Sequence, residues 1–252
     1  KLEDADKMIK ICENNEIRLF VVKQNRFNVP VVKLREALEE NRFGKLVLGT
    51  VRVRWSRNQQ YYDMADWRGT WKNDGGVLSN QASHHIDLLE WMMGSVKSVY
   101  AYSKTALVNI EAEDTAVVLL EFENGSLGVI EATTACRPKD LEGSLSLLGE
   151  GGTVEIGGFA VNEMKVWNFV SKKIDDKNVL SQYSVNPPNV YGYGHQAYYN
   201  NLIQTINKNL SHPVDGHEGR KSLELIHAIY ESIDTGKKVY LDKINFESKL
   251  GR

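Results

Sequence analysis

One short segment combines residue types and a spacing that could bind and move a proton. In DGGVLSNQASHHID, which runs from Asp74 to Asp87, Asn80 and His84 are four positions apart and Asp87 follows His84 by three. On a helix, residues three and four apart share a face. One face would therefore present an amide, an imidazole and a carboxylate. An imidazole in such a place can act as a general acid or base.

The helix that must position these side chains is expected over residues 79–93. Its core-facing stripe consists of Ala82, Ile86, Leu89 and Met93. Two glycines, Gly75 and Gly76, precede the helix and permit a tight turn. A second interpretation stays open, because spacing alone does not exclude it. In that interpretation His84 is a satisfied buried histidine and Asn80 is an N-terminal capping residue.

The elements around this helix indicate an α+β fold. A helix is expected over residues 32–41 and a strand over residues 45–55. Six segments carry β-branched or aromatic residues in partial alternation: residues 99–104, 115–123, 126–136, 143–148, 153–156 and 165–169. No helix separates these strands, and Asn124-Gly125 is a strong hairpin signal, so an antiparallel sheet is expected. Two further helices are expected over residues 195–209 and 217–235.

The first residues of the sequence have a different character. Apolar residues at helical spacing predict an amphipathic helix: Leu2, Ala5, Met8, Ile9 and Cys12. The run RLFVVK, residues 18–23, is expected to be a strand buried on both faces. A helix followed by such a strand is typical of the tail of an α/β unit, so the chain is expected to begin within a domain. Residues 31–252 are interpreted as a separate α+β domain.

Composition narrows the function classes. The 252 residues are 42% hydrophobic and 25% charged, and the formal net charge of −2 argues against a general affinity for nucleic acid. No apolar run is long enough to suggest a membrane span. Cys12 and Cys136 are interpreted as reduced thiols of a cytoplasmic protein. No metal is expected, because His84 and His85 diverge by about 100° on a helix and no ligand cluster completes a site.

The glycine and histidine segment resembles the GGGxxxDxxxHxxD signature of the Gfo/Idh/MocA oxidoreductases. Gly75, Gly76, His84 and Asp87 match it, whereas Asp74 replaces the first glycine. Asn80 replaces the signature aspartate and cannot do acid–base work, although it can hydrogen-bond a hydroxyl. The resemblance implies an NAD-dependent sugar dehydrogenase whose histidine lies beside the reacting hydroxyl. It also implies that residues 1–30 are the remnant of a truncated Rossmann domain and residues 31–252 the substrate-binding and oligomerisation domain.

Several stretches are similar to one branch of that family, the dehydrogenases that oxidise C3 of UDP-N-acetylglucosaminuronate in bacterial surface-polysaccharide synthesis. These stretches are residues 23–26 (KQNR), Tyr61-Tyr62, residues 67–71 (WRGTW), Asn80-Gln81 and residues 215–225. Two alternatives stay open. The enzyme could act on inositol, glucose or another sugar, or the chain could be a non-catalytic binding or oligomerisation fragment.

The resemblance also suggests roles for individual side chains. His84 would assist removal of the hydroxyl proton. The sugar carboxylate and diphosphate would be positioned by Asn80, Lys23, Arg26, Tyr62 and Arg68. Arg26 could equally form a structural salt bridge. In the loop of residues 56–74, Trp67 and Trp71 could stack on a uracil ring or serve as core anchors.

The expected cofactor is NAD, but its main site is expected to lie upstream of Lys1. No Gly-x-Gly-x-x-Gly lies between a strand and a helix in the sequence, and Gly149-Glu-Gly-Gly152 is interpreted as a hairpin turn. The family's Glu-Lys-Pro lysine is also absent, so the chain alone is expected to be inactive. Residues 116–120 are apolar throughout, which is consistent with a sheet covered on both faces. A homo-oligomer, a dimer or tetramer, is expected to form through that sheet.

Overall fold

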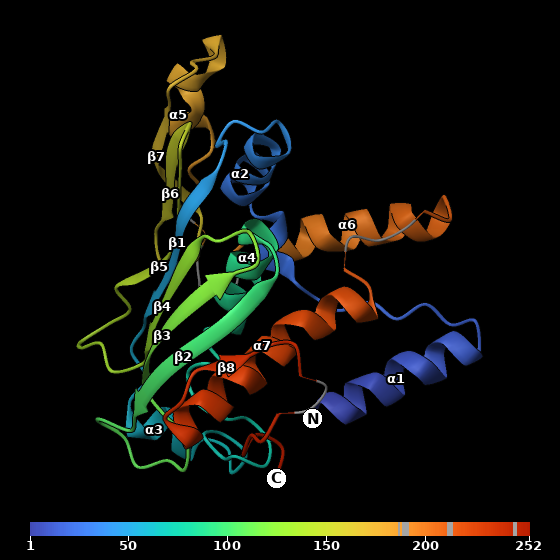
Figure 1. Cartoon of the computed structure of the whole chain (residues 1–252), viewed down its shortest axis with the longest axis vertical. Helices are drawn as coiled ribbons and strands as arrows, with labels where there is room; N and C mark the ends of the chain where they lie inside the picture. Colours follow the sequence, from blue (N-terminus) through green and yellow to red (C-terminus); the bar gives the residue numbers. More distant parts are fainter. Residues whose placement is uncertain (186, 188–191, 211–213, 244–245) are drawn as a thin grey trace.

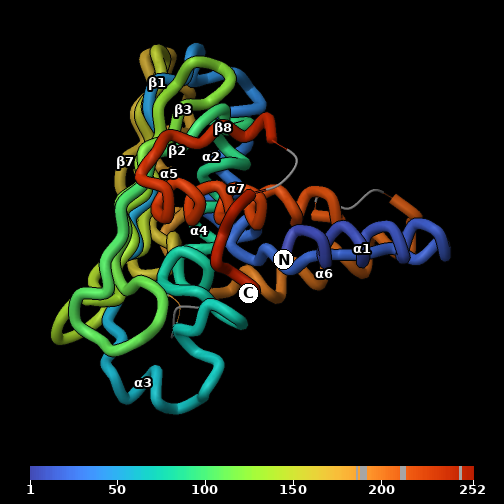
Figure 2. Tube along the Cα trace, turned by 60° about the horizontal axis from the view of Figure 1, so that its bottom comes forward, coloured from blue at the N-terminus to red at the C-terminus, as the bar shows by residue number. Residues whose placement is uncertain are grey.

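The computed structural model describes residues 1–185, 187, 192–210, 214–243 and 246–252. Its helices are α1 (Leu2–Asn14), α2 (Val29–Glu39), α3 (Gln59–Asp63), α4 (Ser83–Met93), α5 (Val179–Gln182), α6 (Gly194–Asn207) and α7 (Gly216–Thr235), with 3-10 turns η1 (Gln24–Phe27) and η2 (Ile174–Asn178). Its strands are β1 (Leu46–Arg54), β2 (Val96–Lys104), β3 (Thr115–Phe122), β4 (Leu127–Thr133), β5 (Glu142–Gly149), β6 (Gly152–Gly157), β7 (Glu163–Phe169) and β8 (Val239–Tyr240). The longer helices lie on one side of a single sheet (Figures 1 and 2).

The sheet has the strand order β7-β6-β5-β1-β4-β3-β2-β8. All neighbouring pairs are antiparallel except β1 and β4, which run parallel with Val51 opposite Ile130. Asn124-Gly125 joins β3 to β4, and the turn between Gly149 and Gly152 joins β5 to β6. The predicted α+β fold with a mainly antiparallel sheet is therefore confirmed. The single parallel pair was not predicted, because hairpin signals report only on strands adjacent in sequence.

The core lies between the inner face of the sheet and helices α2, α4 and α7. Along β3 the buried residues Ala116, Val118 and Leu120 alternate with Val117 and Leu119, which are 48% and 54% exposed. In this chain the helices cover one face of the sheet (Figure 2). Within the chain itself, residues 116–120 are therefore not covered on both faces, contrary to the expectation from the sequence. The other face carries exposed apolar side chains.

The expected strand over residues 18–23 is wrong. The segment is extended, but it forms an isolated β-bridge, between Phe20 and Asp215, and not a ladder. Val22 is 39% exposed. A β-strand needs a neighbour along its length. Among the described residues no second strand runs beside this segment, so an apolar sequence run by itself did not produce a strand.

The helix expected over residues 79–93 begins later, at Ser83, and Asn80 lies in the turn before it. The N-cap is Ala82, so the interpretation of Asn80 as the capping residue is also wrong. Hydrogen bonds such as that from the Ala82 amide to the Val77 carbonyl (2.8 Å) close turns ahead of the helix. The i, i+4 relation of Asn80 and His84 therefore crosses a helix start instead of lying within a helix.

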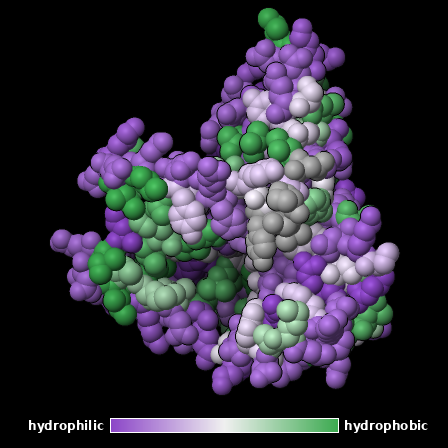
Figure 3. Space-filling view, turned by 180° about the vertical axis from the view of Figure 1, so that it is seen from behind, coloured by the Kyte–Doolittle hydropathy of each residue, from purple (hydrophilic) through white to green (hydrophobic). Residues whose placement is uncertain are grey.

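Helices α1 and α6 project away from the sheet (Figure 1). Seen from behind, the projecting part of the molecule carries both hydrophobic and hydrophilic surface (Figure 3). Exposed apolar residues occur on both helices, among them Met8, Ile11, Tyr199, Ile203 and Ile206. In the part of the chain that the structure describes, no helix is long and apolar enough to cross a membrane.

Candidate functional site

Two buried side chains clamp the turn that leads into α4. Glu113 Oε1 accepts hydrogen bonds from the Leu78 amide and from the Tyr230 hydroxyl, each at 3.0 Å. The Tyr230 hydroxyl accepts in turn from the Gly76 amide at 3.1 Å. Burial raises the pKa of the Glu113 carboxyl to about 7. The clamp fixes where α4 starts and hence where its histidine lies.

Gly76 is required for this clamp because a side chain has no room there. A Cβ on Gly76 would lie 2.1 Å from the Glu113 carbonyl oxygen and 2.4 Å from its carboxyl carbon. We expect Gly76→Ala to lower the free energy of unfolding by about 1–3 kcal/mol, the usual cost of overpacking. Urea-unfolding midpoints measure it.

Gly125→Ala is the matched control for that substitution. Gly125 has a φ of +81° but open space around its Cβ position. Gly125→Ala should therefore lower the free energy of unfolding only by the cost of placing alanine in the left-handed conformation, about 1 kcal/mol. Equal effects of the two substitutions would contradict the steric argument.

His84 lies in the first turn of α4 and faces η1. Its Nε2 is 3.3 Å from the Gln24 side-chain nitrogen, and its Nδ1 is buried without a hydrogen-bond partner among the described residues. The pKa of His84 is lowered to about 4, mainly because burial disfavours the charged ring. Repulsion from Lys23 and His195 lowers the pKa further, whereas attraction to Asp87 raises it. At neutral pH the ring is uncharged and can accept a proton.

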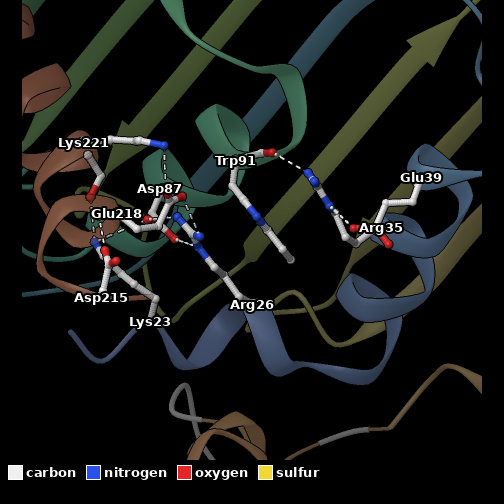
Figure 4. Close-up of polar contacts among 10 residues, drawn as sticks. Lys23, Arg26, Arg35, Glu39, Asp87, Trp91, Asp215, Glu218 and Lys221 are labelled. Carbon is white, nitrogen blue, oxygen red and sulfur yellow. Dashed lines mark hydrogen bonds and ion pairs between the residues drawn. The ribbon is translucent and has the colours of Figure 1, made fainter. Parts of the chain in front are cut away.

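A buried ion-pair network joins η1 to α4 and α7 (Figure 4). Arg26 donates two hydrogen bonds to Asp87, each at 2.8 Å, and a third to Glu218 at 2.9 Å. Lys23 Nζ lies 2.7 Å from the Ser222 hydroxyl and 3.6 Å from Asp87 Oδ1. The structure thus shows the salt-bridge alternative for Arg26, whose side chain is 4% exposed.

Trp91 lies between two guanidinium groups at the edge of this network (Figure 4). Arg26 and Arg35 stand 4.8 and 4.9 Å from its ring, which is the geometry of a cation–π contact. Arg35 also donates to the Trp91 carbonyl oxygen at 2.8 Å and pairs with Glu39. The network therefore ties η1 and α2 to α4 and restricts the position of residues 23–28.

Asn80 is held by Asp74 at the other side of the helix start. Its side-chain nitrogen donates to Asp74 Oδ1 at 2.5 Å, and the second carboxylate oxygen accepts from the Gly69 amide at 3.0 Å. Asn80 is half-buried. Both residues depart from the signature: Asp74 replaces its first glycine and Asn80 replaces its aspartate. In the structure these two replacements are hydrogen-bonded to each other.

The aromatic loop lies apart from Lys23 and Arg26. Tyr62 is 5% exposed and its hydroxyl is 3.0 Å from the Thr134 hydroxyl. Arg68 donates to the Tyr61 carbonyl at 2.6 Å and its guanidinium is 4.1 Å from the Tyr61 ring. Trp71 packs on Tyr230, as a core anchor would.

Trp67 is 46% exposed and does not anchor the loop in the core. The hollow lined by Tyr62 and Arg68 also contains Asp63, Asp66 and Glu111. Carboxylates at that place disfavour a diphosphate.

The predicted ligands thus fall into two neighbourhoods. Lys23 and Arg26 both pair with Asp87, three residues after His84, whereas Tyr62 and Arg68 belong to the loop of residues 56–74. Each of these four residues already has a protein hydrogen-bond partner, although the Nε atom of Arg68 has none among the described residues. Their contact with a sugar stays a prediction.

Three residues of the site were not selected from the sequence: Gln24, Glu113 and Tyr230. Only Gln24 had a sequence signal, since it stands in the KQNR stretch. Glu113 and Tyr230 reach Gly76 from a distant loop and a distant helix, so no local pattern could reveal them.

His85, next to the candidate base, is a buried neutral histidine. It is 1% exposed, neither ring nitrogen has a hydrogen-bond partner among the described residues, and its ring packs edge-on against Trp55. Burial, followed by nearby His84, lowers its pKa to about 3. The unfolded chain binds a proton here near its ordinary pKa of about 6.5. Between pH 6.5 and 3 the unfolded state is therefore favoured as pH falls, by about 1.4 kcal/mol per pH unit.

We expect His85→Phe to lose less stability than the unsubstituted chain between pH 6.5 and pH 5, because phenylalanine does not titrate. Urea titrations at both pH values measure the difference. Glu90 and Glu113, whose pKa values burial raises to about 7, act in the opposite direction, since the folded form retains their protons above pH 4.5. Their contribution is the same in both proteins and cancels. Parallel pH dependences would contradict the assignment to His85.

The described residues do not fit the diphosphate half of a dinucleotide. Residues 1–28 form α1, an extended segment and η1, not the strand–glycine turn–helix unit that holds a dinucleotide. Among the described residues there is also no cluster of three or more histidine, cysteine, aspartate or glutamate side chains placed to hold a metal. What the site does offer is a neutral imidazole, an amide and neighbouring cations.

Comparison with known proteins identifies the family of the chain. A family described as "Oxidoreductase family, C-terminal alpha/beta domain", of the Gfo/Idh/MocA group, matches residues 35–241. The chain belongs to this family. The resemblance of the Gly75-Gly76 and His84 segment to the family signature is thereby confirmed at the level of the family.

Several characterised proteins are similar. The WlbA dehydrogenase from Bordetella pertussis, solved in complex with NADH and UDP-GlcNAcA, is 44% identical with a TM-score of 0.91, and the match covers 96% of this chain and 70% of that one. Myo-inositol 2-dehydrogenase from Thermotoga maritima is 24% identical over 96% of this chain and 70% of its own length. D-apiose dehydrogenase from Rhizobium rhizogenes is 24% identical over 54% of this chain, and the match spans 38% of that enzyme.

Proposed function

We propose that this chain is the substrate-binding part of an NAD-dependent dehydrogenase that oxidises the C3 hydroxyl of UDP-N-acetylglucosaminuronate in bacterial surface-polysaccharide synthesis. The observation that carries the proposal is the 44% identity and TM-score of 0.91 to an enzyme solved with NADH and UDP-GlcNAcA. The neutral His84 beside the buried network of η1 and α4 is consistent with it.

Oxidation of a secondary alcohol releases a hydride and a proton, and His84 would receive the proton. Its lowered pKa keeps the ring in the accepting form at neutral pH but makes it a weak base. Proton transfer is most efficient when the catalytic pKa is near the working pH, so we propose that His84 shares this task with the Glu-Lys-Pro lysine of the family. Asn80, through its amide oxygen, would accept a hydrogen bond from a sugar hydroxyl.

Lys23, Arg26, Tyr62 and Arg68 are retained as proposed contacts for the sugar carboxylate and diphosphate. Lys23 is the most direct of these proposals, because it lies near His84 and its charge suits a carboxylate. For Arg26 to bind substrate it would have to release Asp87 or Glu218.

We propose NAD as the cofactor. A nucleotide-binding unit, additional to the residues present here, would hold its diphosphate. Residues 1–252 alone are therefore proposed to be inactive. Incubation of this polypeptide with NAD and UDP-N-acetylglucosaminuronate should give no increase in absorbance at 340 nm. Formation of NADH without an added partner would overturn this part of the proposal.

A cyclic polyol or another sugar is the second candidate substrate, favoured by the similarity to myo-inositol 2-dehydrogenase over almost the whole chain. Thermal-shift assays with free UDP separate the two candidates. If UDP stabilises the chain, a nucleotide sugar is supported; if myo-inositol stabilises it and UDP does not, the second candidate is supported.

We also propose a cytoplasmic homo-oligomer, a dimer or tetramer, that uses the uncovered face of the sheet. Exposed apolar residues on that face include Val117, Leu119 and Leu127. Sedimentation velocity would test this proposal, and a monomer at micromolar concentration would contradict it.

A further inference from the structure

We propose that Gln24 is a positioning residue for His84: its side-chain amide donates a hydrogen bond to Nε2 and holds the neutral ring in the tautomer with hydrogen on Nδ1. The tautomer is a property of the folded chain. Only its catalytic consequence rests on the proposed function.

The contact itself defines the direction of the hydrogen bond. The Gln24 side-chain nitrogen lies 3.3 Å from His84 Nε2. An amide nitrogen donates and does not accept, so Nε2 must be the acceptor. In a neutral imidazole the other nitrogen then carries the hydrogen. That nitrogen, Nδ1, is buried and has no partner among the described residues.

The position of Gln24 is fixed from several directions. It is 4% exposed and stands in η1, two residues before Arg26, which is bound to Asp87 and Glu218. On the opposite side α6 approaches so closely that a Cβ on Gly194 would lie 2.1 Å from the Gln24 carbonyl oxygen. The backbone of Gln24 therefore cannot easily move away from the imidazole.

The charged and titratable groups around the ring come from three elements. Lys23 precedes η1 and His195 belongs to α6, and both disfavour a charged imidazole; Asp87 on α4 favours it. The Gln24 donor acts at Nε2 itself, so it selects directly between the two neutral tautomers. A sugar hydroxyl that reaches Nε2 would meet its lone pair and take over the place of the Gln24 donor.

Nitrogen-15 NMR of the histidine ring tests the proposal in the chain as it stands, because protonated and unprotonated ring nitrogens resonate far apart. In the unsubstituted chain, His84 should show hydrogen on Nδ1 and none on Nε2. In Gln24→Glu the carboxylate accepts instead of donating, so the hydrogen should move to Nε2 and the pKa of His84 should rise. In Gln24→Leu both tautomers should be populated.

Gln204→Glu is the matched control, since Gln204 is exposed on α6, and it should leave the His84 signals unchanged. Hydrogen on Nε2 in the unsubstituted chain, or the same tautomer in all variants, would overturn the proposal. If Gln24→Glu does not fold, the unsubstituted chain and Gln24→Leu still decide.

In the complete enzyme, Gln24→Leu should lower kcat by about 10- to 100-fold with little change in KM, by analogy with the partners that orient metal-bound imidazoles. Turnover with an unchanged kcat would overturn the positioning role. Absence of turnover with any sugar, together with the expected NMR tautomer, would instead count against the proposed function and leave the tautomer established.

Discussion

Replacing His84 with alanine in the complete enzyme is expected to lower kcat/KM for the nucleotide sugar by about 10²- to 10⁴-fold, the usual contribution of a general acid–base group. We expect this loss of activity because the imidazole of His84 is uncharged at neutral pH and can accept the proton of the hydroxyl. The ring lies against the side chain of Gln24. Initial rates of NADH formation measure the effect. The fall should appear mainly in kcat, because the proton is transferred in the chemical step.

His217→Ala provides the matched control, since His217 is exposed and pairs with Glu13 of α1. It should leave the rate within a factor of two or so. If the two substitutions have equal effects, or if His84→Ala raises only KM, His84 does not handle the proton.

Replacing Asp87 with alanine is expected to have the largest effect on stability, a loss of about 3–5 kcal/mol. Asp87 is 2% exposed and accepts two hydrogen bonds from Arg26. Without Asp87, the buried guanidinium keeps one anionic partner among the described residues, Glu218. Urea unfolding monitored by circular dichroism would measure the change.

The exposed pair of Arg35 and Glu39 is a control within the same region (Figure 4). Glu39 is 63% exposed, and exposed pairs contribute about 0–1 kcal/mol, so Glu39→Ala should change the free energy of unfolding little. A double replacement, Arg26→Met with Asp87→Leu, should recover much of the loss, because it removes both buried charges. Equal losses in the Asp87 and Glu39 variants would contradict the account.

Local patterns predicted much of the fold. The hairpin at Asn124-Gly125 and the alternation of the strands report on neighbours in sequence, and both the strands and the α+β class were found. The strand expected over residues 18–23 failed because an apolar run does not reveal whether a partner strand lies beside it. The parallel pairing of β1 with β4 was not predicted for the same reason, since it joins segments about 80 residues apart.

The site was predicted in part. The spacing of His84 and Asp87 identified one turn of α4, and Arg26 was recognised as a possible salt-bridge residue. The partners that give these residues their properties were out of reach of any local pattern. The pKa of His84 depends on burial and on His195, and the start of α4 depends on Glu113, which contacts it through the folded chain.

If residues 1–252 recognise a nucleotide sugar, isothermal titration calorimetry of this polypeptide should show saturable binding of UDP-N-acetylglucosaminuronate. UDP should compete for the same site, and NAD alone should not bind. Binding of myo-inositol without any binding of UDP or the nucleotide sugar would contradict the account.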